Sequence, residues 1–213
     1  FVIGDVYVYP KIIENRIMEI QAIEFIVNQI DNVIKLPRDA WAEGGDVVPH
    51  NEYLFVGYSE KEDFSKYEVA RTNKAAIDFF SETFSNCIVK GFELNKSDTD
   101  PKMNALHLDC CFQPVGTNSA IIYEGGFKNI EDIEFLVNYF GDENLIRISQ
   151  DEMYNMNSNV FSISPDVIVS EKGFTRLNNE LRKRGFTVEE VRYSEISKME
   201  GLLRCSTLPL RRK

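Results

Sequence analysis

Residues 46–90, DVVPHNEYLFVGYSEKEDFSKYEVARTNKAAIDFFSETFSNCIVK, carry the pattern that decides the fold. They predict a strand at Val47-Val48, a second strand at Tyr53–Val56, a helix from about Ser65 to Phe84 and a third strand at Cys87–Lys90. The helix is indicated by apolar residues at three- and four-residue steps, namely Ile77, Phe80 and Phe84. The stretch therefore predicts a unit with the order strand, strand, helix, strand.

The same order of elements recurs twice further along the chain. The second unit comprises strands at 106–112 and 120–123, a helix at 130–140 and a strand at 145–148. The third comprises strands at 160–163 and 167–169, a helix at 174–184 and a strand at 188–193. Gly141 and Gly185 follow the two helices, where a C-terminal cap favours a residue that tolerates positive φ. Such a unit buries its apolar helix face only against neighbouring units, so the repeat predicts a ring of α/β units.

The N-terminal part of the chain fits the same unit with its first strand absent. A strand at 1–9 is followed by a helix at 14–30 and a strand at 33–36. Because the chain opens directly in an apolar strand, we expect it to begin inside a fold. The whole chain, 1–213, is expected to form a single domain that is incomplete at its N-terminus.

The composition restricts the partners and the compartment. The 213 residues carry 24 Lys and Arg against 34 Asp and Glu, a net charge of −10. This balance argues against a broad surface for nucleic acid or an anionic membrane, since phosphate binding needs clustered cations, and it suits a small cationic ligand. No run reaches the ~20 apolar residues of a membrane helix, and no secretory signal opens the chain, so we expect a cytoplasmic protein. Residues 211–213, all basic, are expected to be a solvated tail.

The four cysteines give no sign of a metal centre or a disulfide framework. Cys87, Cys110, Cys111 and Cys205 include no CxxC pair, and a chain of this length does not need disulfides to hold its core. We therefore expect no bound metal. A lone cysteine such as Cys205 is inert unless a cationic or basic neighbourhood lowers its pKa. Arg204 and His107 are the residues that would supply that neighbourhood.

Two short polar motifs are candidates for a site. In Leu106-His107-Leu108-Asp109, alternation along a strand places His107 and Asp109 on one face, and the alternative is a buried histidine that has a purely structural role. In Glu43-Gly44-Gly45-Asp46, two glycines allow close approach of a ligand between two acids, and the alternative is an ordinary acidic turn. The other histidine, His50, is predicted to be a solvated turn residue.

Five motifs in this order resemble the guanidine-modifying superfamily, which includes the amidinotransferases, arginine deiminase and dimethylarginine dimethylaminohydrolase. They are Glu43-Gly-Gly-Asp46, Arg71-Thr-Asn73, His107-Leu-Asp109, Asn157-Ser-Asn159 and Gly201-Leu-Leu-Arg-Cys205. The family fold is the pentein, a five-bladed α/β propeller of strand-strand-helix-strand units, and it agrees with the repeat found above. The resemblance implies an enzyme that acts on the guanidinium carbon of arginine or a related guanidino compound without a cofactor.

The resemblance also implies a role for each candidate residue. Cys205 would be the nucleophile that forms a covalent thiouronium intermediate, and His107 would serve as acid and then as base. Glu43 would orient His107 and favour its protonated form. Asp109 would bind the guanidinium nitrogens and Asp46 would line the same mouth. Arg71 resembles the arginine that contacts the substrate carboxylate.

One feature of the family is missing from this sequence. Relatives carry a further Arg-Asp motif just upstream of the strand that corresponds to 1–9, and its aspartate helps to bind the guanidinium group. Arg38-Asp39 has the right residues but lies in the wrong unit. At a spacing of roughly 55 residues per unit, a closed ring of five needs about 60 residues more. We therefore expect the natural polypeptide to continue upstream of Phe1.

Three interpretations of function remain open. The leading one is a guanidine-modifying enzyme, with hydrolysis slightly preferred over amidino transfer. Whether the acceptor is water or an amine depends on solvent access and lid closure, which the sequence does not show. The second is a noncatalytic binding protein with the same fold, as in ring proteins that act as ribosome-associated factors. The third is an α/β domain whose polar residues only satisfy one another. Ring proteins of this kind often pair, so a homodimer is a candidate assembly, although no exposed stripe in the sequence indicates an interface.

Overall fold

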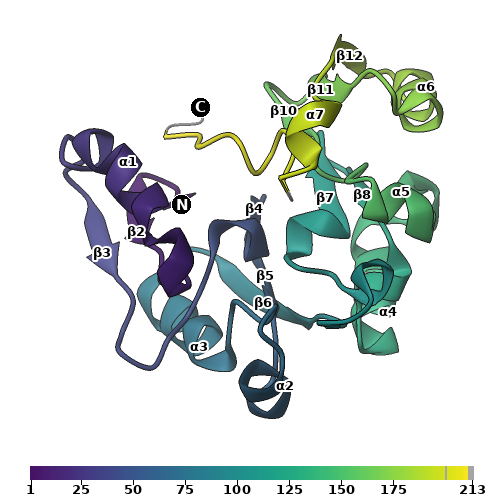
Figure 1. Cartoon of the computed structure of the whole chain (residues 1–213). Coiled ribbons are helices and arrows are strands. Elements are labelled where there is room, and N and C mark those ends of the chain that lie inside the picture. Colours follow the sequence, from purple (N-terminus) through teal and green to yellow (C-terminus); the bar gives the residue numbers. More distant parts are fainter. Residues whose placement is uncertain (200, 211–213) are drawn as a thin grey trace.

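Four three-stranded sheets follow one another along an arc (Figure 1) in a computed structural model that describes residues 1–199 and 201–210. In each sheet the first two strands pair antiparallel, and the second and third pair parallel. One or two helices connect each parallel pair, as a parallel crossover requires. The predicted α/β fold of repeated units is therefore confirmed. The basic tail predicted at 211–213 lies outside the described residues.

The first two sheets contain the N-terminal half of the site. The first is built from β1 (Val2–Ile3), β2 (Val6–Tyr9), η1 (Glu14–Arg16), α1 (Ile17–Val27) and β3 (Val33–Lys35). The second is built from η2 (Gly44–Asp46), β4 (Val47–His50), β5 (Tyr53–Tyr58), α2 (Lys61–Lys66), α3 (Lys74–Thr83) and β6 (Ile88–Glu93).

The last two sheets carry the C-terminal half of the site. The third unit comprises η3 (Pro101–Met103), η4 (Leu108–Cys110), β7 (Phe112–Val115), β8 (Ser119–Ile122), η5 (Glu124–Gly126), α4 (Ile130–Phe140), η6 (Asp142–Asn144) and β9 (Leu145–Arg147). The fourth comprises α5 (Gln150–Tyr154), β10 (Phe161–Ser162), β11 (Val167–Glu171), α6 (Thr175–Lys183) and β12 (Thr187–Val191), followed by α7 (Ser194–Ser197).

The first unit is more complete than the sequence pattern indicated. The predicted strand at 1–9 is a hairpin, in which Gly4 turns the chain at φ +61° between β1 and β2. The first strand predicted to be absent is therefore present, although it has only two residues. The described residues therefore form four complete units, and β12 is the last strand among them.

Two other predicted elements differ from the structure. The helix predicted at about 65–84 is two helices, α2 and α3, because Asn73 leaves the helical conformation and its side chain accepts a hydrogen bond from Ala76 N as an N-cap. The strand predicted at 106–112 begins only at Phe112. The residues before it form an extended segment at His107 and the short turn η4.

The apolar residues form two clusters, one for each side of the second sheet. The smaller cluster joins the first unit to α3, and the larger one joins β5 and β6 to the third and fourth units. His50 belongs to this packing and is not the solvated turn residue that was predicted. It is only 8% exposed, and its ring lies 5.2 Å from that of Phe140 in α4. Within the described residues, no helix has the length and apolar character that crossing a membrane would require.

Candidate active site

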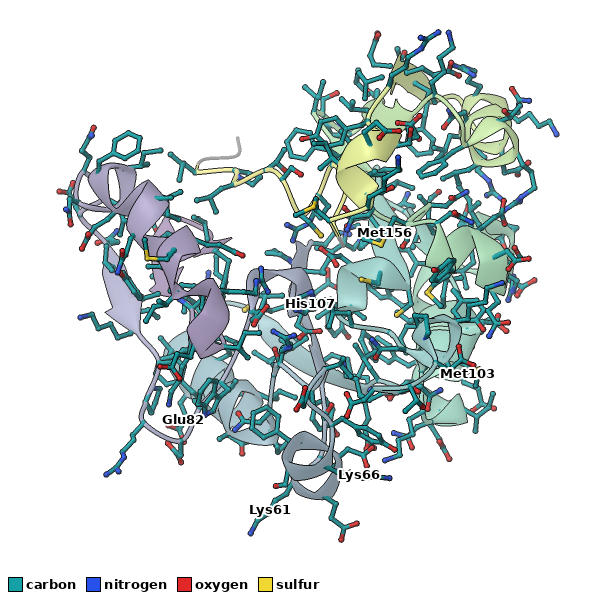
Figure 2. All side chains as sticks on the ribbon, in the orientation of Figure 1. Lys61, Lys66, Glu82, Met103, His107 and Met156 are labelled. Atoms are coloured by element: carbon teal, nitrogen blue, oxygen red, sulfur yellow. The ribbon has the colours of Figure 1, made fainter. Side chains whose placement is uncertain are left out.

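Residues from the first three units and from the C-terminal segment meet around one cavity of about 1550 Å³. The side chains drawn in Figure 2 place His107 at the centre of the arc, between the N-terminal unit and the rest. The cavity is lined by five of the six predicted site residues, namely Glu43, Arg71, His107, Asp109 and Cys205. Four loops carry them to this place, and the pattern of the sequence did not reveal that the loops converge. Within the described part of the chain, no group of three or more His, Cys, Asp and Glu is arranged to hold a metal ion.

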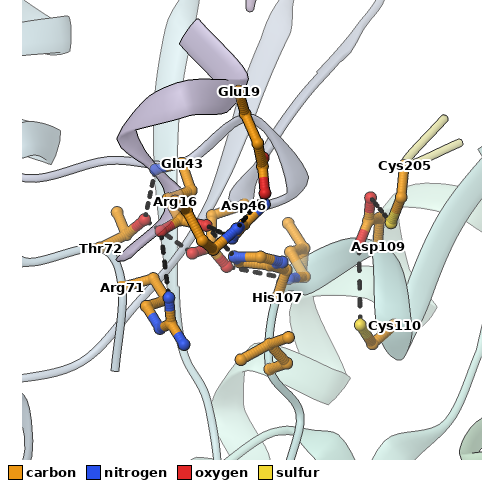
Figure 3. Close-up of polar contacts among 12 residues, drawn as sticks. Arg16, Glu19, Glu43, Asp46, Arg71, Thr72, His107, Asp109, Cys110 and Cys205 are labelled. Atoms are coloured by element: carbon orange, nitrogen blue, oxygen red, sulfur yellow. Dashed lines mark hydrogen bonds and ion pairs between the residues drawn. The ribbon is translucent and has the colours of Figure 1, made fainter. Parts of the chain in front are cut away.

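His107 is paired with Glu43 at the wall of this cavity (Figure 3). Nε2 of His107 lies 3.1 Å from Oε2 of Glu43, and both side chains are buried. Gly45 makes this placement possible, since a Cβ there would lie 2.8 Å from the imidazole ring. Burial alone would lower the pKa of His107, but Asp46, Glu43 and Asp109 outweigh it and raise this pKa above its ordinary value. The pair therefore favours a protonated imidazole.

Glu43 also contacts two arginines. Its Oε2 accepts a hydrogen bond of 2.7 Å from Nη1 of Arg16, and its Oε1 lies 3.4 Å from Nη1 of Arg71. Burial would raise the pKa of Glu43, but the hydrogen bond from His107 and the charges of His107, Arg16 and Arg71 lower it to about 2. Glu43 is thus a carboxylate at every ordinary pH, in contact with three cationic groups.

Asp109 lies next to the predicted nucleophile. The Sγ atom of Cys205 is 3.8 Å from Oδ2 of Asp109, and the buried thiol of Cys110 is 3.7 Å from Oδ1 (Figure 3). Desolvation by the surrounding protein and the charge of Asp109 raise the pKa of the Cys205 thiol to about 12, although the residue as a whole is exposed. Burial also raises the pKa of Asp109. Without a ligand, this arrangement favours a protonated thiol.

The loop of Cys205 is held by the Asn157-Ser158-Asn159 motif. Oδ1 of Asn159 accepts hydrogen bonds from the backbone N–H groups of Arg204, at 3.0 Å, and Cys205, at 3.2 Å. Nδ2 of Asn159 donates to Sγ of Cys205 at 3.2 Å. The neighbouring hydroxyl of Ser158 donates to the backbone carbonyls of Asp109 and Cys110. Two adjacent side chains therefore fix the thiol loop and the segment that carries Asp109.

Asp46 does not lie where the sequence predicted. Among the described residues it is not part of the cavity lining, and it is 1% exposed. Its Oδ2 accepts a hydrogen bond from the hydroxyl of Thr72 at 2.6 Å, and its Oδ1 accepts one from Leu108 N at 2.9 Å. Gly57 leaves the space for this carboxylate, since a Cβ there would lie 2.5 Å from Oδ1. The structure thus places Asp46 behind His107, as a support for the backbone and not at the mouth.

Lys96 was not singled out in the sequence and completes this support. It is only 9% exposed, and its Nζ donates to the carbonyls of Ala105 and Leu106 at 2.7 and 2.8 Å. Asp46 accepts a hydrogen bond from Leu108 N on the other side of His107. The buried charges of Lys96 and Asp46 therefore hold the backbone before and after this histidine. A lysine of this kind leaves no local signal, because a single Lys between polar residues is normally solvated. Arg16 was missed for a similar reason, since its partner Glu43 is 27 residues away.

Known proteins match this chain over most of its length. The model of the eukaryotic N,N-dimethylarginine dimethylhydrolase family matches residues 3–212. Uncharacterized protein YkgA of Bacillus subtilis is 30% identical over 172 residues, which cover 81% of this chain and 53% of that protein, so the chain spans about half of this relative.

Solved structures match over nearly the whole chain. The N-terminal domain of ArgZ bound to substrate, an arginine dihydrolase from cyanobacteria, superposes with a TM-score of 0.80 at 20% identity and covers 99% of this chain and 73% of that one. DDAH from Pseudomonas aeruginosa complexed with citrulline gives a TM-score of 0.74 at 18% identity, covering 96% and 71%. At this level of identity the structures show the fold alone, which is the pentein fold of repeated α/β units. The family match and this fold together lead to one conclusion: the chain belongs to the N,N-dimethylarginine dimethylhydrolase family.

Proposed function

We propose that this protein hydrolyses the guanidinium group of arginine or a related guanidino compound through a covalent intermediate on Cys205. The observation that carries the proposal is the lining of one cavity by a thiol, a carboxylate 3.8 Å away and a histidine–glutamate pair. A carboxylate suits the planar N–H donors of a guanidinium ion, and the acidic chain favours a cationic ligand. The enzymes named in the two solved structures act on arginine or bind citrulline, which is consistent with this class of substrate.

Substrate binding would activate the nucleophile. The carboxylate of Asp109 raises the pKa of the Cys205 thiol when the cavity holds no cation. A guanidinium ion hydrogen-bonded to Asp109 would neutralise that charge and place its own positive charge beside the sulfur, so both effects would favour the thiolate. The thiolate would then form only where its target carbon is already bound.

The two chemical steps need one group that gives and then takes a proton. The thiolate sulfur attacks the guanidinium carbon and forms a C–S bond, and protonated His107 gives its proton to the departing nitrogen as the C–N bond breaks. Neutral His107 then removes a proton from water, whose oxygen attacks the thiouronium carbon. The hydroxyl proton passes to the sulfur as the C–S bond breaks, which releases a ureido product and restores the thiol of Cys205. Glu43 would keep the imidazole oriented and favour its protonated form for the first step.

The opposite end of the substrate would meet the arginines. Arg71 lines the cavity, and its Nε is buried and has no hydrogen-bond partner among the described residues. Arg16 lines the same cavity with a side chain that is 37% exposed. Guanidinium groups bind carboxylates in a bidentate manner, so these two side chains would bind the carboxylate of the substrate.

The test is to incubate the protein with arginine, N-methylated arginines and other guanidino compounds, with and without glycine, and to resolve products and intact protein by mass. A ureido product with released ammonia or alkylamine supports hydrolysis, whereas guanidinoacetate with ornithine would establish amidino transfer instead. Cys205→Ser should abolish both the product and the protein adduct, while Cys87→Ser, which changes a thiol outside the site, should change neither. The absence of product and adduct in the unmodified protein would contradict the proposal and favour a noncatalytic binding protein.

A further inference from the structure

The side chain of Asn159 is committed entirely to the nucleophile loop. The residue is 0% exposed, and its three side-chain hydrogen bonds with described residues all go to Arg204 and Cys205. If Asn159 only held the loop in place, the two hydrogen bonds that its side-chain oxygen accepts from the loop backbone would be sufficient. The third bond is made to the atom that the proposed reaction uses.

The orientation of this amide is determined by its partners. The nitrogen and oxygen ends of an asparagine are similar in shape, and the hydrogen-bond network decides between them. The backbone N–H groups of Arg204 and Cys205 can only donate, so the end that faces them must be the oxygen. The NH₂ end is therefore fixed toward the sulfur of Cys205, at 3.2 Å.

The sulfur of Cys205 lies between one group that disfavours the thiolate and one that stabilises it. Asp109 faces it with a carboxylate oxygen at 3.8 Å and disfavours a negative charge on sulfur. Asn159 faces it with an N–H donor, and a donor stabilises a charged acceptor more strongly than a neutral one. Arg204 adds a distant positive charge, and its guanidinium group donates to the carbonyl of Val47. The thiol of Cys110 also contacts Asp109, and the charges of Arg204 and His107 act on the same carboxylate.

We propose that Asn159 is a catalytic residue of this site, whose amide N–H donates to the sulfur of Cys205 and stabilises the thiolate that attacks the substrate. Its carbonyl oxygen at the same time fixes the backbone of the loop, so the donor and the sulfur are held together by one planar group. This inference rests on the proposed function, because it assigns a role in forming the nucleophile of that reaction. Asn159 differs in this respect from its neighbour Ser158, whose hydroxyl holds the backbone of Asp109 and Cys110 and is not hydrogen-bonded to the sulfur among the described contacts.

The proposal is tested by the rate at which iodoacetamide alkylates Cys205 over a pH series, with Cys87 of the same molecule as the internal reference. Asn159→Asp keeps the size of the side chain and its acceptor oxygen but removes the donor, so the relative rate at Cys205 should fall at least about tenfold, as expected for a lost hydrogen bond to a charged group. Asn159→Ala should also slow the reaction, and by less than Asn159→Asp, because it adds no negative charge. Asn178→Asp, at a fully buried amide in α6, is the matched control and should leave the rate unchanged.

Unchanged alkylation of Cys205 in both Asn159 variants, with thermal unfolding like that of the unmodified protein, would overturn the proposal. If the variants do not fold, the same contact is read in folded protein near neutral pH: the side-chain NH₂ resonances of Asn159 should move in Cys205→Ala, which removes the sulfur that accepts the hydrogen bond. NH₂ resonances that do not move in Cys205→Ala would equally overturn the proposal. Alkylation of Cys205 requires no turnover and therefore tests the role of Asn159 separately from the activity. If alkylation is slow in the Asn159 variants but the unmodified protein gives no product in the mass assay, only the proposed hydrolase activity is contradicted.

Discussion

The thiol of Cys205 and the carboxylate of Asp109 lie 3.8 Å apart, from Sγ to Oδ2, although 96 residues separate them in the chain. An anion beside a nucleophile that must itself become an anion opposes the first step of the chemistry. The protonated thiol can donate to this carboxylate, whereas a thiolate beside it is favoured only when a cation occupies the cavity. The resting state of the site and its reactive state should therefore differ in the charge of the sulfur.

Asp109→Asn separates these two effects of the carboxylate. Without the negative charge, the pKa of the Cys205 thiol falls from about 12, so iodoacetamide should alkylate Cys205 about tenfold faster than in the unmodified protein. Turnover of arginine should instead be lost, because the acceptor for the guanidinium nitrogens is gone. The alkylation rate is measured by peptide mass against Cys87.

Asp78→Asn on the exposed surface of α3 is the control for this variant, and it should change neither quantity. Alkylation of Cys205 that is slower in Asp109→Asn than in the unmodified protein would show that the carboxylate does not suppress the thiolate.

His107 should titrate at a higher pH than His50. Nearby carboxylates raise the pKa of His107 above 6.5, and burial lowers the pKa of His50 below it. Glu43→Gln removes the carboxylate that contacts Nε2 of His107, so the titration midpoint of that imidazole should fall by about one pH unit or more. The chain has only two histidines, so ¹H NMR resolves both, and the midpoint of His50 should not move. An unshifted His107 would contradict the pairing.

The repeated units could be predicted because their signals are local. The helix predicted at 130–140 is α4, with the same limits, since its apolar residues keep helical spacing and Gly141 ends it at φ +83°. The break between α2 and α3 was not predictable in this way. Asn73 ends the irregular segment by accepting hydrogen bonds from Ala76 N and from Trp41 N, and the second partner is 32 residues away.

The candidate site was predictable as a set of residue types and not as a geometry. Alternating polar and apolar residues around His107 indicated a strand, but Lys96 and Asp46 bind the backbone there and hold it as an irregular segment. Asp46 was expected at the mouth because it belongs to an acidic Gly-Gly motif. Only the packing of β5, through Gly57, shows that its carboxylate points into the protein.

His50 should make the protein less stable in acid. Because its pKa is lower in the folded state than in the unfolded state, the unfolded chain binds the proton first. Its contribution to the free energy of unfolding is therefore complete above pH ~6.5 and is lost as the pH falls toward its folded-state pKa. His107 acts in the opposite direction: its contribution is complete below pH ~6.5 and declines as the pH rises through its own raised pKa.

Urea unfolding at pH ~7 and pH ~5 measures this effect. In His50→Phe, which cannot take up a proton, the loss of stability between the two pH values should be smaller than in the unmodified protein. An equal loss in both proteins would assign the acid sensitivity to other groups.

Lys96→Met tests whether the buried ammonium positions His107. Methionine keeps the length of the side chain but leaves the carbonyls of Ala105 and Leu106 without their donor, which should lower the free energy of unfolding by about 1–3 kcal/mol. If the segment also shifts, kcat for the guanidino substrate should fall at least about tenfold while KM changes little, because the misplaced group acts in proton transfer and does not bind the substrate. Lys90→Met, which breaks an ion pair with Asp132 away from the cavity, should affect stability alone. Equal kcat in the two variants would limit Lys96 to a structural role, whereas recovery of kcat in Lys96→Arg would show that a cationic donor is what the segment requires.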